Sequence, residues 1–404
     1  MALLAEYHCG VGEKDAGYMF MGMSFQAVRF CEFPDPLAKQ RSPHIALLSV
    51  IGRNDRDITP NEGVIAFPES INRSWHFWSA FGYDKLMAID FDFEYEVHIP
   101  RSGISHPLVD DELDNQPWLL ESPSTSLTNI PYANLITATF YESCKLMIIT
   151  TEIIDTVHRR KKQALEERIV IDTHLRLDTW FNELPDKLTI RANSASPLPH
   201  VIMLHICYWW LLIILHQPPI QNVSTEVEAK LPSIEGLSTK IRDRAGHKIV
   251  QLLKMFDRQH GLRFFPRNMI EAICACGTAL LWEYTSTSAA AQKKRSNAID
   301  GVGACVTALR TISVTWPYAQ TRADDLEARL QKHFPPEFIM TQVDDPSLNP
   351  SHNLLEEQGL DDFTDISSEL QQYMNEWHVL PFEVSQSSGL SSEMFGPEPS
   401  NHQE

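Results

Sequence analysis

The stretch VIMLHICYWWLLIIL, residues 201–215, decides the fold class because it is the most apolar part of the chain. It is shorter than the roughly 18–20 apolar residues that a membrane-spanning helix needs, and it contains His205. We therefore predict a buried core helix over residues 199–216, which Pro218 and Pro219 end. No membrane association is expected of this chain.

On both sides of this stretch, apolar residues recur at helical spacing, and strand-like alternation is scarce. Helices are predicted over residues 17–33, 71–87, 132–158, 169–184, 199–216, 242–260, 267–285, 289–316 and 319–333. Residues 38–70, 90–131 and 221–240 are rich in polar residues, Gly or Pro and are predicted to be loops. The fold class predicted is all-α, a multi-helix bundle with long loops.

The C-terminal segment has a different composition. Residues 343–404 contain 13 Asp and Glu and no Lys or Arg, interleaved with bulky apolar side chains. Charge repulsion favours disorder, so the expected division is a helical domain at 1–340 and an acidic, largely disordered tail at 341–404. This composition is typical of activation segments that contact co-activators or the transcription machinery, and a solubilising tail is the alternative.

Charge limits the other functions of the chain. The net charge of −19 argues against a duplex-binding surface, so no DNA-binding residue is predicted. The basic run RRKK at residues 159–162 is expected at the C-terminal end of a helix, where cations interact favourably with the helix dipole. A nuclear import signal is the alternative for this run.

No catalytic or metal site is predicted, because no nucleotide-binding, hydrolase or metalloprotease motif occurs. Cys274 and Cys276 have no second cysteine pair at ligand spacing and are expected to pack in the core. His205 and His216 lie eleven residues apart, too far along a helix to share an ion. We predict that both are hydrogen-bonded core or rim histidines, and that the chain binds no cofactor.

Two N-terminal segments carry the first part of a family resemblance. DAGYMFMGMSFQAVRF, residues 15–30, is similar to a helix of the form A-W-x-Y-x-G-M-A-x-R-M-A, with Gly22 at its glycine. NRSWHFWSAFGYDKLMA, residues 72–88, is similar to R-R-x-x-F-W-x-x-F-x-x-D-R, matched by Arg73, Trp78 and Asp84 among others. The aromatic residues are expected to pack in the bundle, and Asp84 to pair with a cation.

Two later segments complete the resemblance. LRLDTWFNELPDKL, residues 175–188, supplies Trp180 and Pro185, and LHICYWWLLIILHQPPI, residues 204–220, supplies His205, His216 and Pro218. In this order and spacing, the four segments resemble the fungal-specific transcription factor domain. This domain is the middle homology region of zinc-cluster (Zn2Cys6) activators of the xylanolytic and nitrate-regulator type.

The resemblance implies a nuclear regulator of RNA polymerase II transcription and not an enzyme. The zinc cluster of the family is absent here, so an N-terminally truncated regulatory region without zinc or direct DNA contact is expected. Homodimers or heterodimers with related factors and a small-molecule effector are the expected partners. A truncated co-regulator or dominant-negative partner that acts by protein association is the alternative, and an enzyme on an unrelated all-α fold is a third.

An effector would need a cavity. Trp75, Trp78, Trp209 and Trp210 are the candidate lining residues, because ligand sites are commonly apolar and aromatic. Plain core packing of these four side chains is the alternative.

Overall fold

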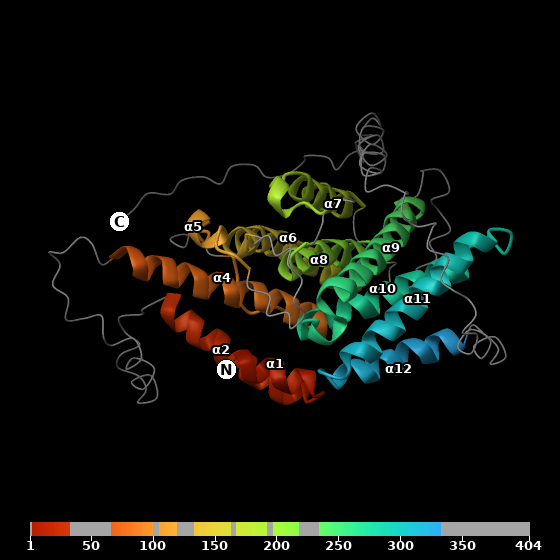
Figure 1. Cartoon of the computed structure of the whole chain (residues 1–404), viewed down its shortest axis with the longest axis horizontal. Coiled ribbons are helices and arrows are strands. Elements are labelled where there is room, and N and C mark those ends of the chain that lie inside the picture. The colour runs from red at the N-terminus through yellow and green to blue at the C-terminus, as the bar shows by residue number, and fades with distance from the viewer. Residues whose placement is uncertain are drawn as a thin grey trace, which may run out of the picture. The chain divides into compact units, whose positions relative to one another are not determined.

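The computed structural model describes residues 2–32, 66–99, 105–118, 133–162, 167–191, 197–217 and 234–332 (Figure 1). Every regular element in these ranges is a helix, which confirms the all-α prediction. The chain divides into two compact units, Met1–Asp362 and Phe363–Glu404, and all the described residues belong to the first. The acidic tail lies outside them, so its predicted boundary at residue 341 and its disorder stay predictions.

The N-terminal half of the domain contains α1 (Ala2–Gly10), α2 (Lys14–Glu32), α4 (Ala66–Phe91), α5 (Asp111–Asp114), α6 (Ile136–Lys162), α7 (Glu167–Asn182) and the 3-10 turn η3 (Asp186–Leu188). The remainder contains α8 (Pro199–Leu215), α9 (Ile234–His260), η4 (Leu262–Phe264), η5 (Arg267–Met269), α10 (Ile270–Ser286), α11 (Gln292–Ile312) and α12 (Tyr318–Gln331). The nine predicted helices are all present, with shifted ends, whereas α1 and α5 were not predicted.

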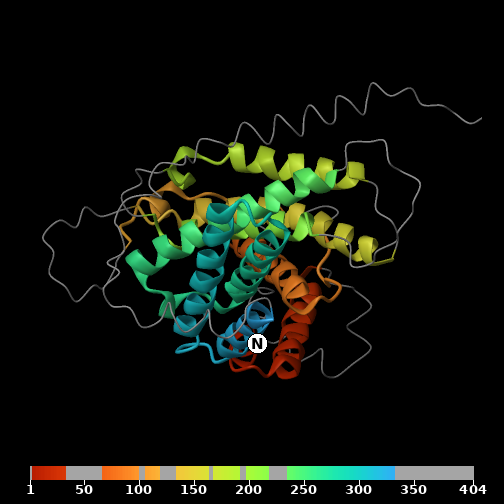
Figure 2. The ribbon, with the colours of Figure 1, turned by 90° about the vertical axis from the view of Figure 1, so that its right-hand side faces the viewer.

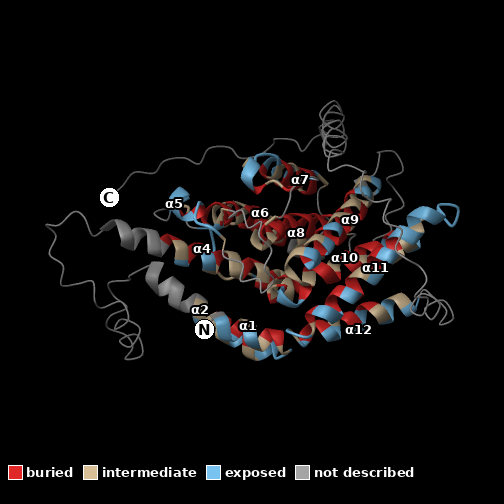
Figure 3. Ribbon diagram, viewed as in Figure 1, coloured by how far each residue is buried: buried red, intermediate tan, exposed pale blue. Residues whose placement is uncertain are grey.

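The apolar helix α8 lies at the centre of the bundle. It packs against α9, α6, α10 and α7, and nearly all of its length is buried (Figure 3). Pro199 opens the helix at a position where its missing N–H costs nothing. The prediction of a buried core helix is therefore confirmed. In the part of the chain that the structure describes, no helix is both long and apolar enough to cross a membrane.

Local chemistry sets where several helices end. Asp92 follows α4 with φ 57°, and Gly261 follows α9 with φ 79°. The backbone therefore adopts the left-handed conformation directly after each of these two helices. Helix α5 begins because the Asp110 carboxylate accepts a hydrogen bond from the Leu113 amide at 3.0 Å. Helix α6 ends at Lys162, so the RRKK run forms its last turn as predicted.

The C-terminal helices approach one another closely. A Cβ atom on Gly301 of α11 would lie 2.7 Å from a methyl carbon of Leu280, so Leu280 would have to shift to admit a larger residue there. The same contact buries three thiols, those of Cys274, Cys276 and Cys305, and the sulfur atoms of the last two are 3.6 Å apart. The predicted core role of Cys274 and Cys276 is confirmed by this burial.

Helices α1 and α2 form a hairpin that packs on α4, and α1 also contacts η5 and α12 (Figure 2). An ion pair fastens α1 to the rest of the bundle, because the Arg267 Nε atom lies 2.5 Å from a carboxylate oxygen of Glu6. The same guanidinium lies 3.2 Å from Asp90 at the end of α4. These partners are far apart in the sequence, which explains why local patterns did not predict α1.

Candidate functional site

A chain of four buried polar side chains and one half-buried serine crosses the interface between α7, α8 and α9. We call it the histidine seam, and it consists of Ser238, His216, His174, Asp178 and Tyr208. The His216 ring is 2.9 Å from the Ser238 hydroxyl through Nδ1 and 2.8 Å from His174 Nδ1 through Nε2. His174 Nε2 lies 3.3 Å from one Asp178 oxygen, and the Tyr208 hydroxyl donates to the other at 2.8 Å. Three helices are thus joined by one polar connection.

Helical spacing assembles the seam. His174 and Asp178 are four residues apart on α7, so they share one face of that helix. Tyr208 lies on α8, His216 caps the C-terminal end of that helix eight residues later, and Ser238 comes from the second turn of α9. His174, Asp178 and His216 are all buried, so each needs partners within the protein.

The distances define a direction for the hydrogen bonds. Burial, followed by the neighbouring Asp178 carboxylate, raises the pKa of Tyr208 well above its usual value, so Tyr208 stays protonated and donates. We place a proton on His174 Nε2, which faces the Asp178 carboxylate at 3.3 Å without making a hydrogen bond to it. His174 Nδ1 then accepts from His216 Nε2, and His216 Nδ1 accepts from the Ser238 hydroxyl.

The hydrogen bonds of the seam join α7, the C-terminal end of α8 and the second turn of α9, and this geometry stabilises the packing of α7 on α8.

His205, the other predicted histidine of α8, belongs to a separate contact. Its Nε2 lies 2.8 Å from the Leu188 carbonyl of η3. Burial lowers the pKa of His205 to about 4, so its ring is neutral near neutral pH and donates this hydrogen bond. The prediction that His205 and His216 are hydrogen-bonded core histidines is confirmed, and each contacts a different element.

The remaining motif residues of this region lie close by. Trp180 is buried, and its indole N–H donates to Glu142 of α6 at 3.1 Å. Pro185 precedes η3 and places it directly after α7. Pro218 lies outside the described residues.

A second polar cluster fastens the segment after α4 back onto that helix. The buried carboxylate of Asp84 accepts hydrogen bonds from the amides of Glu96 and Val97 at 2.9–3.1 Å. Its neighbour Lys85 is fully buried, pairs with Asp84 at 2.8 Å and donates to the Val97 carbonyl. Burial lowers the pKa of Lys85. The predicted pairing of Asp84 with a cation is confirmed, and the side chain of Arg73 lies outside what the structure describes.

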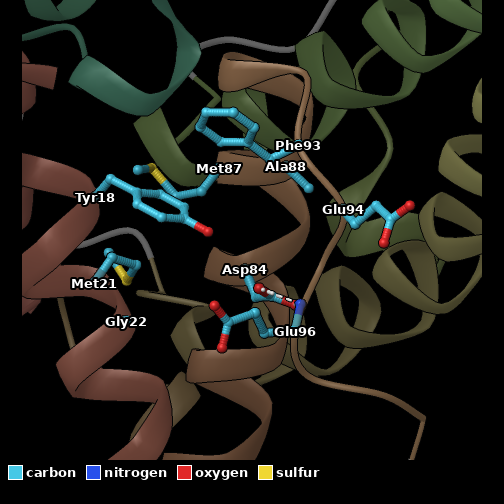
Figure 4. Close-up of a pocket in the computed structure, with 9 residues that line it drawn as sticks. All are labelled: Tyr18, Met21, Gly22, Asp84, Met87, Ala88, Phe93, Glu94 and Glu96. Atoms are coloured by element: carbon cyan, nitrogen blue, oxygen red, sulfur yellow. Dashed lines mark hydrogen bonds between the residues drawn. The ribbon is translucent and has the colours of Figure 1, made fainter. Parts of the chain in front are cut away.

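Residues 92–97 and α2 enclose a crevice beside this cluster (Figure 4). Its lining residues are Tyr18, Met21, Gly22, Asp84, Met87, Ala88, Phe93, Glu94 and Glu96. The cavity volume is about 10 Å³, which is room for about one water molecule. Gly22, a motif residue, lies on its α2 side.

The four tryptophans of the predicted cavity lie in other surroundings. Trp75 stacks on Phe140 with ring centroids 4.4 Å apart, and Trp78 donates to the Ser105 carbonyl at 2.8 Å. Trp209 and Trp210 are buried in α8. None of the four lines the crevice between α2 and α4, and the effector cavity stays a prediction.

Sequence reasoning did not identify the α7 half of the seam. The signal was present, because His174 and Asp178 are the His and Asp of an i, i+4 pair within the apolar pattern of IVIDTHLRLDTW. Arg267, Glu6 and Asp90 were also missed, and no local pattern joins them. Within the described ranges, no group of three or more His, Cys, Asp or Glu side chains could hold a metal ion.

The sequence is 22% identical over 272 residues to the nitrogen assimilation transcription factor nirA of Emericella nidulans, an alignment that covers 65% of this chain and 27% of that protein. The chain therefore spans about a quarter of the length of this relative in the alignment. No family model and no solved structure matches the sequence. The similarity supports the relationship with fungal zinc-cluster transcription factors that the four motifs predict.

Proposed function

We propose that this chain is a transcription regulator, the regulatory region of a fungal zinc-cluster type factor that controls RNA polymerase II transcription in the nucleus. The observation that carries the proposal is the similarity to a nitrogen assimilation transcription factor over 272 residues. The placement of the motifs adds support, because Gly22, Asp84, Trp180 and His216 each lie at a contact between elements.

In this proposal the chain regulates but does not contact DNA itself. The net charge of −19 opposes binding to phosphates, and a zinc cluster is not among its motifs. The helical domain would receive a signal, such as a small-molecule effector or a partner factor, and the acidic tail would contact co-activators. A thermal-shift screen of metabolites against the full chain tests the effector, and a set of ligands without any stabiliser would argue against it.

A reporter assay in a fungal host tests the activating role. The full chain is fused to an unrelated sequence-specific DNA-binding domain placed upstream of a reporter gene, and expression is expected to rise. Replacing Leu370, Tyr373 and Trp377 by Ala should lower expression, because these apolar side chains are the ones a co-activator groove would capture. Gln371→Ala with Gln372→Ala is the matched control, which should leave expression unchanged.

The reporter result can also contradict the proposal. A fusion that never changes expression, although it accumulates in the nucleus, would exclude an activating tail. The second candidate is a co-regulator that acts through protein association, and the exposed apolar side chains of α1 and α2 favour it. In that case the chain without any fused domain should alter the activity of an intact relative, as measured with the reporter of that relative.

A further inference from the structure

Helix α1 is attached to the bundle by few buried side chains. Among residues 3–10, whose burial the structure describes, only Ala5, Cys9 and Gly10 are buried, and all three are small. Small side chains remove little apolar area from water, so their burial stabilises the contact only weakly. Leu3 and Tyr7 are 85% and 57% exposed and add little to it. A helix of nine residues is too short to stay folded alone, so α1 is helical only while it is docked.

The ion pair between Glu6 and Arg267 supplies the strongest polar attachment of α1. Arg267 Nε donates to one Glu6 oxygen at 2.5 Å, and its Nη2 donates to the other at 3.3 Å. The Arg267 residue is only 4% exposed, so water and salt screen this pair little. The docking of α1 therefore depends strongly on whether Arg267 is available to Glu6.

Asp90, at the end of α4, competes with Glu6 for the same guanidinium. One Asp90 oxygen lies 3.2 Å from Arg267 Nη2, yet both oxygens are buried and neither has a hydrogen-bond partner in the structure. An ionised carboxylate is costly in such a place, whereas an uncharged carboxyl group is tolerated. Burial raises the pKa of Asp90 to about 8, with Arg267 opposing the rise and the carboxylates of Glu271 and Glu6 adding to it.

The other charged or titratable groups near Asp90 do not replace Arg267 as its partner. Glu271 of α10 pairs with Arg322 of α12 at 2.7 Å. The Lys14 ammonium of α2 lies over aromatic rings of α4 and α12. Burial raises the pKa of the Cys9 thiol on α1, which keeps this thiol uncharged. Among these described groups, Arg267 is thus the one cation that Asp90 and Glu6 share.

We propose that α1 is a strap that opens when Asp90 ionises and takes Arg267 from Glu6. In the closed state Asp90 is uncharged, and Arg267 holds Glu6. As pH rises, Asp90 gives its proton to solvent and attracts the guanidinium, so α1 loses its anchor and unfolds. Opening uncovers the Trp316 ring, which packs so closely against Gly10 that an added Cβ would lie 2.3 Å from it. The inference goes beyond the transcriptional role and does not depend on it.

Alkylation of Cys9 in the full chain tests this proposal. The rate of reaction with iodoacetamide is measured by peptide mass spectrometry and divided into the rate of the urea-unfolded chain at the same pH, which cancels the titration of the thiol itself. This protection should fall by at least about tenfold between pH 6 and pH 8, because the closed state binds the Asp90 proton more tightly than the open state. Asp90→Asn should keep its protection over that range. Cys276, fully buried in α10, is the internal control and should stay protected.

Glu6→Gln is the second variant, because it removes the anion that holds Arg267. Cys9 should then lose protection already at pH 6, by at least about tenfold. Glu13→Gln is the matched control: Glu13 belongs to the same hairpin, but it pairs with His8 at 2.6 Å and not with Arg267. This control should titrate as the wild type does. Circular dichroism verifies that each variant is folded.

Three outcomes would overturn the proposal. Equal dependence on pH in the wild type and Asp90→Asn would show that Asp90 does not control the strap. A dependence that disappears in Glu13→Gln would assign it to the pair of His8 and Glu13. Parallel loss of protection at Cys9 and Cys276 would show that the whole domain opens and that α1 is not a separate strap.

Discussion

Acid should destabilise this protein through His205, and replacement of that residue should remove the effect. The ring is 3% exposed and donates to the Leu188 carbonyl, and burial lowers its pKa to about 4. An unfolded chain has an ordinary histidine with a pKa of about 6.5. His205→Gln keeps an N–H donor at a similar length from the backbone but cannot take up a proton.

The sign and size follow from the two pKa values. Above about pH 6.5 both states carry neutral His205, and the residue contributes no dependence on pH. Between about pH 6.5 and pH 4 the unfolded chain binds a proton that the folded protein refuses, so stability falls as pH falls. Between about pH 7 and pH 5 the calculated loss is about 2 kcal/mol, and below about pH 4 the total loss levels off at about 3 kcal/mol.

The assay is urea unfolding of the full chain, monitored by tryptophan fluorescence at the two pH values. The wild type should lose about 2 kcal/mol more free energy of unfolding than His205→Gln on acidification. His98→Gln is the control, because His98 is exposed and should behave as the wild type. An equal loss in the wild type and His205→Gln would refute the inference that His205 is neutral and buried in the folded state.

Three further outcomes are expected from other parts of the fold. Burial raises the pKa of Asp90 to about 8, so its contribution to stability is lost as pH rises from about 4 to about 8. In urea unfolding, Asp90→Asn should therefore gain about 5–6 kcal/mol in free energy of unfolding relative to the wild type over that range. Gly10→Ala should cost about 1–3 kcal/mol in urea unfolding, because the new Cβ would lie 2.3 Å from a ring carbon of Trp316. Asp84→Asn leaves the buried Lys85 without its carboxylate, so it should cost about 3–5 kcal/mol and accelerate amide hydrogen exchange in residues 93–99.

The helices could be predicted from the sequence because most have a buried apolar face. Helix α8 was the clearest case. An apolar run of that length, followed by a pair of prolines, is compatible with few structures other than a buried helix. Helix α4 begins five residues earlier than predicted, and Pro68 in its first turn was an available signal. Helix α1 could not be predicted, because its ion pair joins Glu6 to Arg267, residues 261 positions apart.

The candidate site was predictable in part. Asp84 could be expected to pair with a cation because a buried carboxylate requires one, but the partner turned out to be the adjacent Lys85. The hydrogen bonds from the amides of Glu96 and Val97 to Asp84 depend on the turn at Asp92. The left-handed backbone of Asp92 does not follow from its residue type alone. The seam needs three helices to meet, so spacing along one helix could reveal only His174 with Asp178.

The polar residues of α8 determine how this helix is rotated about its own axis, which its apolar residues alone do not determine. A helix that is apolar on every side gains similar free energy from many rotations about its axis. His205, Tyr208 and His216 lie on one stripe of α8, and they meet the Leu188 carbonyl, Asp178 and His174. Any other rotation would bury these groups without partners, at a cost of about 1–3 kcal/mol for each. The stripe therefore selects which side of α8 faces α7 and η3, which makes the histidine motif a determinant of the orientation of this helix.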